Sequence, residues 1–110
     1  MATAKNEGFS ARHNKAAGML KAMGHPARVA IVEYLIGRDS CVCGDIVEQL
    51  PLAQATVSQH LKALKEAGLI QGTIEGATVC YCIDEKAIHF VSGYLLGLSD
   101  RVNVQKKKCC

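Results

Sequence analysis

The chain contains no tryptophan, and aromatic residues make up only 5% of its 110 residues. Because 49% of the residues are nevertheless hydrophobic, the core must be built mainly from aliphatic side chains. A chain of this length is expected to form one domain with a modest core. No apolar run approaches the roughly 20 residues that a membrane-spanning helix requires, so we expect no membrane partner.

Signals for export and for catalysis are also missing. The N-terminal stretch MATAKNEGFSARHNK has no hydrophobic segment of the kind found in secretory signals, so we expect a cytoplasmic protein. The chain has no Ser–His–Asp spacing, no glycine-rich phosphate loop and no paired catalytic carboxylates. We therefore expect neither enzymatic activity nor a catalytic cofactor. The net charge of +3 permits DNA binding but is too small to demonstrate it.

A helical pattern extends over residues 51–69, PLAQATVSQHLKALKEAGL. Val57, Leu61 and Leu64 fall at i, i+4 and i+7, which places them on one stripe of a helix. The opposite side is small and hydrogen-bonding near its start, and such a face suits a DNA major groove. Gly68 is expected to end the helix, because glycine tolerates the left-handed conformation. The residues expected to contact DNA are Gln54, Thr56, Ser58, Gln59, His60 and Lys62.

The preceding segment completes a helix-turn-helix pattern. Residues 41–50, CVCGDIVEQL, are predicted to form its first helix, which Pro51 ends before a short turn. The N-cap of the second helix, Ala53 or Gln54, lacks the Ser or Asp side chain usually favoured there.

After this helix the apolar period changes from 3.6 to 2. The stretches LIQGTIEG and ATVCYCI are predicted to form two strands of a hairpin, the wing, with residues 75–77 as its connection. The second strand divides its side chains between two faces, with Val79, Tyr81 and Ile83 on one and Cys80 and Cys82 on the other. We expect the apolar trio to face the body and both thiols to point outward.

Three more helices frame this unit. Residues 12–23 show helical spacing, and Pro26 suits the first turn of the next helix, with His25 as a capping or surface residue. Asp84 is expected to cap a last helix over residues 85–98. The apolar stripe of that helix consists of Ile88, Val91, Leu95 and Leu98. So short a chain leaves little core for this stripe to cover, so we expect a partner subunit.

The segments GHPARVAIVEYL, CVCGDIVEQL and ATVSQHLKALKEAGLI resemble the ArsR/SmtB metal-sensing repressors, which are winged helix-turn-helix dimers. The resemblance covers about residues 16–98. It implies a mainly α fold with a small β-hairpin wing (α+β), a homodimer interface from the first and last helices, and binding to double-stranded operator DNA. The expected organisation is a flexible tail (1–11), the winged helix-turn-helix domain (12–99) and a flexible basic tail (100–110).

The six cysteines occur in pairs, at positions 41 and 43, 80 and 82, and 109 and 110. Without an export signal we expect reduced thiols. Such clustering favours metal or redox chemistry, and soft thiolates select As(III), Sb(III), Cd(II), Pb(II), Cu(I) or Zn(II) over harder ions.

Cys41 and Cys43 are the expected metal(loid) ligands. Inside a regular helix their side chains would point about 200° apart, but at a loop–helix junction the first cysteine can swing round. The helix N-terminus also favours the thiolate form. The placement resembles the family's cysteine motif, whose third cysteine in arsenic sensors is replaced here by Ile46. A third thiol is therefore expected from the tail or, as a second choice, from the wing, the candidates being Cys109, Cys110, Cys80 and Cys82.

The expected function is a repressor that releases its operator when a thiophilic metal(loid) binds, with As(III) or Sb(III) favoured and Cd(II), Pb(II) or Zn(II) as alternatives. A second hypothesis uses the same residues. It is a redox or reactive-sulfur switch in which Cys41 or Cys43 bonds to a tail cysteine. The family's other frequent metal site, on the last helix, is represented here only by His89 and Asp100, so we expect no zinc site there.

Overall fold

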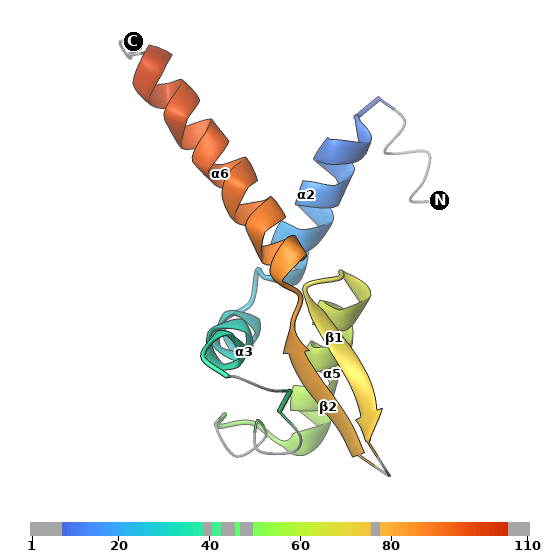
Figure 1. Cartoon of the computed structure of the whole chain (residues 1–110). Helices are drawn as coiled ribbons and strands as arrows, with labels where there is room; N and C mark the ends of the chain where they lie inside the picture. The colour runs from blue at the N-terminus through green and yellow to red at the C-terminus, as the bar shows by residue number, and fades with distance from the viewer. Residues whose placement is uncertain (1–7, 39–40, 43–45, 47–49, 76–77, 106–110) are drawn as a thin grey trace.

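The computed structural model describes residues 8–38, 41, 42, 46, 50–75 and 78–105, and for residues 73–75 and 78 the backbone only. Within these residues, helices and a two-stranded antiparallel sheet follow one another in a simple order: α2 (Ala11–Ala22), α3 (Pro26–Ile36), α5 (Gln54–Glu66), β1 (Ile70–Glu75), β2 (Thr78–Ile83) and α6 (Glu85–Gln105). Helices α3 and α5 pack with the hairpin into one body. Helices α2 and α6 extend from it on one side and diverge towards their far ends (Figure 1).

The helix boundaries follow local signals that the sequence contains. The side chain of His25 caps α3, because its Nδ1 accepts a hydrogen bond from the backbone N–H of Ala27 at 3.0 Å. Asp84 caps α6 in the same way, with Oδ1 accepting from the N–H of Ala87 at 3.2 Å. Helix α5 begins after Ala53 without a side-chain cap, and Gly68 follows its end with a φ of 83°. These predictions are confirmed.

The two strands of the wing are confirmed, with a register that runs from Ile70 opposite Ile83 to Glu75 opposite Thr78. Glu75 therefore belongs to β1 and not to the connection, while residues 76 and 77 lie outside the described part of the chain. The wing begins directly after α5, which is the second, or recognition, helix of the predicted helix-turn-helix. The N–H of Asp84 donates to the carbonyl of Leu69 at 3.0 Å. This bond closes the base of the hairpin just before α6.

A third chain segment lies alongside β2. Val42 forms an antiparallel bridge with Tyr81, through hydrogen bonds of 2.7 and 2.8 Å between their backbone groups. The prediction that residues 41–50 form a helix from their first residue is therefore wrong at Cys41 and Val42. Backbone pairing with the wing competes with helix formation there. Ile46 is helical and buried, and residues 43–45 and 47–49 lie outside the described ranges.

The described core is aliphatic, as expected, and its largest fully buried side chains are Ile31, Val57, Leu64, Leu69 and Cys80. The burial of Cys80 contradicts the prediction that this thiol points outward, and Val79 is 40% exposed, whereas Tyr81 and Ile83 pack against the core as predicted. Alternation divides a strand into two faces but does not say which one is covered. Cys80 is itself disulfide-bonded, and a small uncharged side chain of this kind can occupy the inner face.

The last helix is longer than predicted. It continues to Gln105, so the expectation of a flexible tail is wrong for residues 100–105, and residues 106–110 lie outside the described part. Val91 is buried, but Leu95, Leu96, Leu98, Val102 and Val104 are exposed. Among the described residues, no helix combines the length and apolar character that a bilayer crossing requires.

Candidate DNA-binding surface and thiol site

Helix α5 presents a polar face to solvent, because its apolar stripe is taken up by the core. Val57 and Leu64 are fully buried, and Leu61 is nearly so. The residues left on the outer face are Gln54, Ala55, Ser58, Gln59, Lys62 and Glu66, with Thr56 half-buried beside them. The amide, hydroxyl and ammonium groups of this face are the types that read base edges and hold phosphates. The structure thus leaves five of the six predicted DNA contacts, all except His60, at least partly accessible.

His60 differs from the other predicted DNA contacts. Its side chain is only 9% exposed, and the Arg28 guanidinium donates from Nε to its Nδ1 at 3.0 Å. The expectation that His60 contacts DNA is wrong, because the residue lies three positions after Val57 and falls within the buried stripe. That spacing was the signal in the sequence that should have identified it.

The environment of His60 favours the neutral imidazole. Burial lowers the pKa of His60, and the neighbouring His25 and Arg28 lower it further. The His25 ring lies 4.4 Å from the His60 ring, centroid to centroid. A second bond of the same guanidinium, from Nη1 of Arg28 to the carbonyl of Ala22 at 3.2 Å, reaches the last residue of α2. Arg28 therefore connects three helices.

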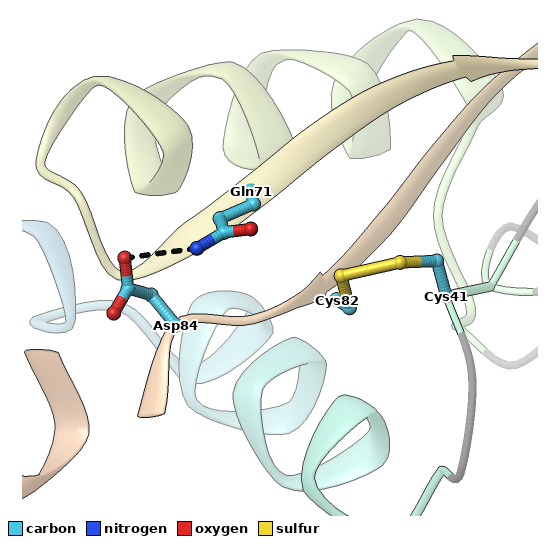
Figure 2. Close-up of a disulfide and its surroundings, with 4 residues drawn as sticks. All are labelled: Cys41, Gln71, Cys82 and Asp84. Atoms are coloured by element: carbon cyan, nitrogen blue, oxygen red, sulfur yellow. Dashed lines mark hydrogen bonds between the residues drawn. A yellow bond between two sulfur atoms is a disulfide. The ribbon is translucent and has the colours of Figure 1, made fainter. Parts of the chain in front are cut away.

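The second candidate site is a pair of cysteines brought together from distant parts of the chain. Cys41 and Cys82 form a disulfide, with their Cα atoms 4.5 Å apart (Figure 2). They meet because their neighbours Val42 and Tyr81 are bridge partners. The expectation of reduced thiols is wrong for this pair in this structure. The bond connects the segment before the recognition helix to the second strand of the wing.

The disulfide lies in the wall of a cavity of about 470 Å³. Its aliphatic lining comes from α3, β2 and α6, and three side chains at its edge carry ionisable groups: Arg38, Glu85 and His89. All three are exposed, so the cavity is open to water and to small solutes. Close by, Nε2 of Gln71 donates to Asp84 at 3.2 Å, and this bond holds the pKa of the Asp84 carboxyl below its ordinary value (Figure 2). The cavity therefore gives small molecules access to the sulfur pair.

The predicted set of metal ligands is only partly described. Cys43, Cys109 and Cys110 lie outside the described residues, and Cys41 has the second-choice residue Cys82 as its partner. In the described part of the chain, no three His, Cys, Asp or Glu side chains are grouped so that they could hold a metal ion. A three-coordinate site would thus need a donor from beyond the described residues.

The arrangement of α5, its preceding turn and the β1–β2 hairpin defines a winged helix-turn-helix DNA-binding protein. A family model described as "Bacterial regulatory protein, arsR family" matches residues 25–71. A transcriptional regulator of Methanocaldococcus jannaschii is 38% identical over 77 residues, which cover 68% of this chain and 85% of the relative. The transcriptional repressor SmtB of Mycobacterium tuberculosis is 42% identical over 74 residues, which cover 66% of this chain and 54% of the relative.

Solved structures agree with the sequence comparison. HlyU from Vibrio cholerae N16961 has a TM-score of 0.65 and 30% identity, covering 80% of this chain and 97% of that chain. HlyU has also been solved in a form described as reduced. The chain belongs to the ArsR family, and more particularly it is a transcriptional repressor of the ArsR/SmtB type.

Proposed function

We propose that this repressor senses the state of its thiols, and that the sensing pair is Cys41 with Cys82. The observation that carries the proposal is the bond between these two residues. It joins the segment before the recognition helix to the wing, so a change at the sulfur atoms acts on both elements. The expected coupling between the thiol site and DNA is about 1–3 kcal/mol, and it is reciprocal.

The partner in this proposal is double-stranded operator DNA in the cytoplasm. Ser58 and Gln59 read base edges from the exposed face of α5, and Lys62 contacts phosphate. Gln54 and Thr56, in the first turn of the helix, contact the backbone or the first bases. A dimer would place two such helices in successive major grooves.

The proposed dimer forms through α6 and α2. Exposed apolar side chains lie on both helices, and an apolar cleft of about 450 Å³ runs between α2, α3 and α6. Its lining includes Leu20, Val29, Ile36, Ile88, Val91 and Leu95. Leaving such a surface in water is unfavourable, and a second copy of this chain would cover it.

In the metal(loid) form of the proposal, the reduced pair binds As(III) or Sb(III), with Cd(II), Pb(II) or Zn(II) as further candidates. Two thiolates whose Cα atoms are 4.5 Å apart can reach the same soft ion. Cys43 or a tail cysteine, Cys109 or Cys110, would supply the third sulfur. The dimer binds its operator without the ion and releases it when the ion is bound.

In the redox form, the disulfide itself is the signal. Two thiols transfer two electrons to hydrogen peroxide, which is reduced to two molecules of water while the sulfur atoms of Cys41 and Cys82 become joined. The disulfide in the structure favours this chemistry, and the description of a reduced form of HlyU is consistent with it. This version replaces the predicted tail cysteine with a wing cysteine.

One titration tests both forms. The probe is a DNA duplex selected by the reduced wild-type protein from a random-sequence pool, and the ligands are As(III), Sb(III), Cd(II), Zn(II), a polysulfide and peroxide. We expect a loss of duplex affinity of about tenfold or more for wild type. Cys41→Ser and Cys82→Ser should bind the duplex but fail to release it.

The ligand that causes release and the behaviour of each variant distinguish the metal(loid) form from the redox form. Release by As(III) under full reduction supports the metal(loid) form, and release by peroxide or polysulfide without metal supports the redox form. Cys109→Ser with Cys110→Ser is the matched control for the tail. Normal release by Cys82→Ser with every ligand would contradict the proposal.

A further inference from the structure

The hydrogen bond between Arg28 and His60 belongs neither to the exposed DNA-binding face of α5 nor to the thiol site. Among the described residues, it is the only side-chain hydrogen bond that joins α5 to another element. We infer that Arg28 and His60 are positioning residues for DNA recognition, and that their hydrogen bond sets the rotation of α5 about its own axis. This inference rests on the DNA-binding activity of the family and does not depend on the nature of the inducer.

The need for such a restraint follows from the packing of the recognition helix. Val57, Leu61 and Leu64 hold α5 against the core, but apolar contacts have little directional preference. Helix α5 also begins after Ala53 without a side-chain cap. A hydrogen bond weakens steeply when its angle changes, so Nε of Arg28 opposes rotation of the helix.

Rotation matters because Gln59 immediately precedes His60. Neighbouring positions on a helix lie about 100° apart around its axis. The rotation of α5 that places His60 against Arg28 therefore also sets the direction of the Gln59 side chain. A base contact of the Gln type requires both groups of the amide to meet the base edge. A small rotation of α5 would therefore reduce specific binding while leaving phosphate attraction intact.

Arg28 is suited to this role because its guanidinium makes two bonds in different directions. Nε donates to His60 and Nη1 donates to the carbonyl of Ala22 at 3.2 Å, which anchors the guanidinium to the end of α2. A lysine in the same place has a single ammonium on a flexible stem and cannot reproduce this fork. The recognition helix is thus oriented relative to α2 as well as to α3.

The bond requires a neutral imidazole. Nδ1 of His60 accepts from Arg28, so the proton of the neutral ring lies on Nε2. The charged and titratable groups that act on His60 are His25 and Arg28, both at the start of α3, and together with burial they lower its pKa. Protonation of Nδ1 would remove the acceptor and add a cation beside Arg28. Specific binding should therefore weaken as the pH falls through the pKa of His60, which lies below the ordinary histidine value of 6.5.

The test compares His60→Asn, His60→Leu and Arg28→Lys with wild type. The probes are the selected duplex and an unrelated duplex, each titrated from about pH 5.5 to about pH 8. Asn carries an acceptor oxygen on the same side-chain position as Nδ1 and does not titrate. We expect His60→Asn to bind the selected duplex like wild type at the alkaline end and to keep that affinity at the acid end.

The other two variants remove the bond. We expect His60→Leu and Arg28→Lys to bind the selected duplex about tenfold more weakly at every pH, with affinity for the unrelated duplex unchanged. Circular dichroism and urea unfolding show whether each variant is folded, and His13→Asn is the control for an exposed histidine. An acid-side decline in His60→Asn equal to that of wild type would overturn the inference. Wild-type affinity in Arg28→Lys would overturn it equally.

Discussion

The recognition helix and the thiol site of this repressor are built in opposite ways. Helix α5 spans 13 residues, and its buried stripe and polar face arise from spacings of three and four positions. The thiol site joins two residues 41 positions apart, and it depends on the pairing of Val42 with Tyr81. A local element tolerates distant changes, whereas a long-range contact is lost when either segment moves. This difference fits the proposal, in which the thiol contact changes and the DNA-binding helix stays folded.

The largest expected effect concerns the long-range site. Breaking the bond between Cys41 and Cys82 should lower the free energy of unfolding by about 4 kcal/mol, because the unfolded chain regains the entropy of a loop closed over 41 positions. Urea unfolding of wild type and of Cys41→Ser/Cys82→Ser, both without a reducing agent, measures this. A reducing agent would also break the disulfide of Cys80, so it cannot isolate the Cys41–Cys82 bond. Equal stability of the two proteins would mean that the stabilisation lies elsewhere.

A smaller loss of unfolding free energy is expected when a core side chain is removed from α5. Leu64→Ala empties a fully buried position of α5 and should cost about 3 kcal/mol of unfolding free energy. Glu66→Ala, at an exposed position of the same helix, is the control and should change stability by less than about 0.5 kcal/mol. A loss in Leu64→Ala no larger than that in Glu66→Ala would contradict the importance of this buried position.

A smaller effect is expected at the exposed face of the same helix. Gln59→Ala should reduce the affinity for the selected duplex about tenfold, since a base contact contributes about 1–3 kcal/mol of discrimination. Stability and the response of the thiol pair should be unchanged, because the Gln59 side chain is exposed. Fluorescence anisotropy with the selected duplex measures the change. Full affinity in this variant would remove α5 as the reading element.

The smallest effect is expected at the base of the wing, where both kinds of contact meet. Bonds from Gln71 and from the N–H of Ala87 lower the pKa of Asp84, so this carboxylate contributes stability above its ordinary pKa of 3.8. The contribution is lost as the pH falls through the lowered value. Asp84→Asn should therefore flatten the acid end of the curve of Tm against pH. An unchanged acid-side slope in this variant would exclude Asp84 as its source.

Much of the fold and the polar face of α5 could be predicted from the sequence, because they depend on local spacing. His25 and Asp84 cap helices, and Gly68 adopts a positive φ, for reasons that lie within a few residues of each. The spacing of His60 also places it in the apolar stripe, and this local signal outweighs its polar side chain as an indication of where it lies. The DNA contacts and the inducer remain proposals.

The sequence by itself determined most of the secondary structure and the family, since periodicity, caps and turn residues act over short distances. Only the tertiary structure decided which thiols meet and which face of β2 is covered. Cys80 is buried and Cys82 bonds to Cys41 because β2 lies between β1 and the segment at Val42. That arrangement is set by packing between segments far apart in the chain, and pairing across such a distance leaves no periodic signal in the sequence.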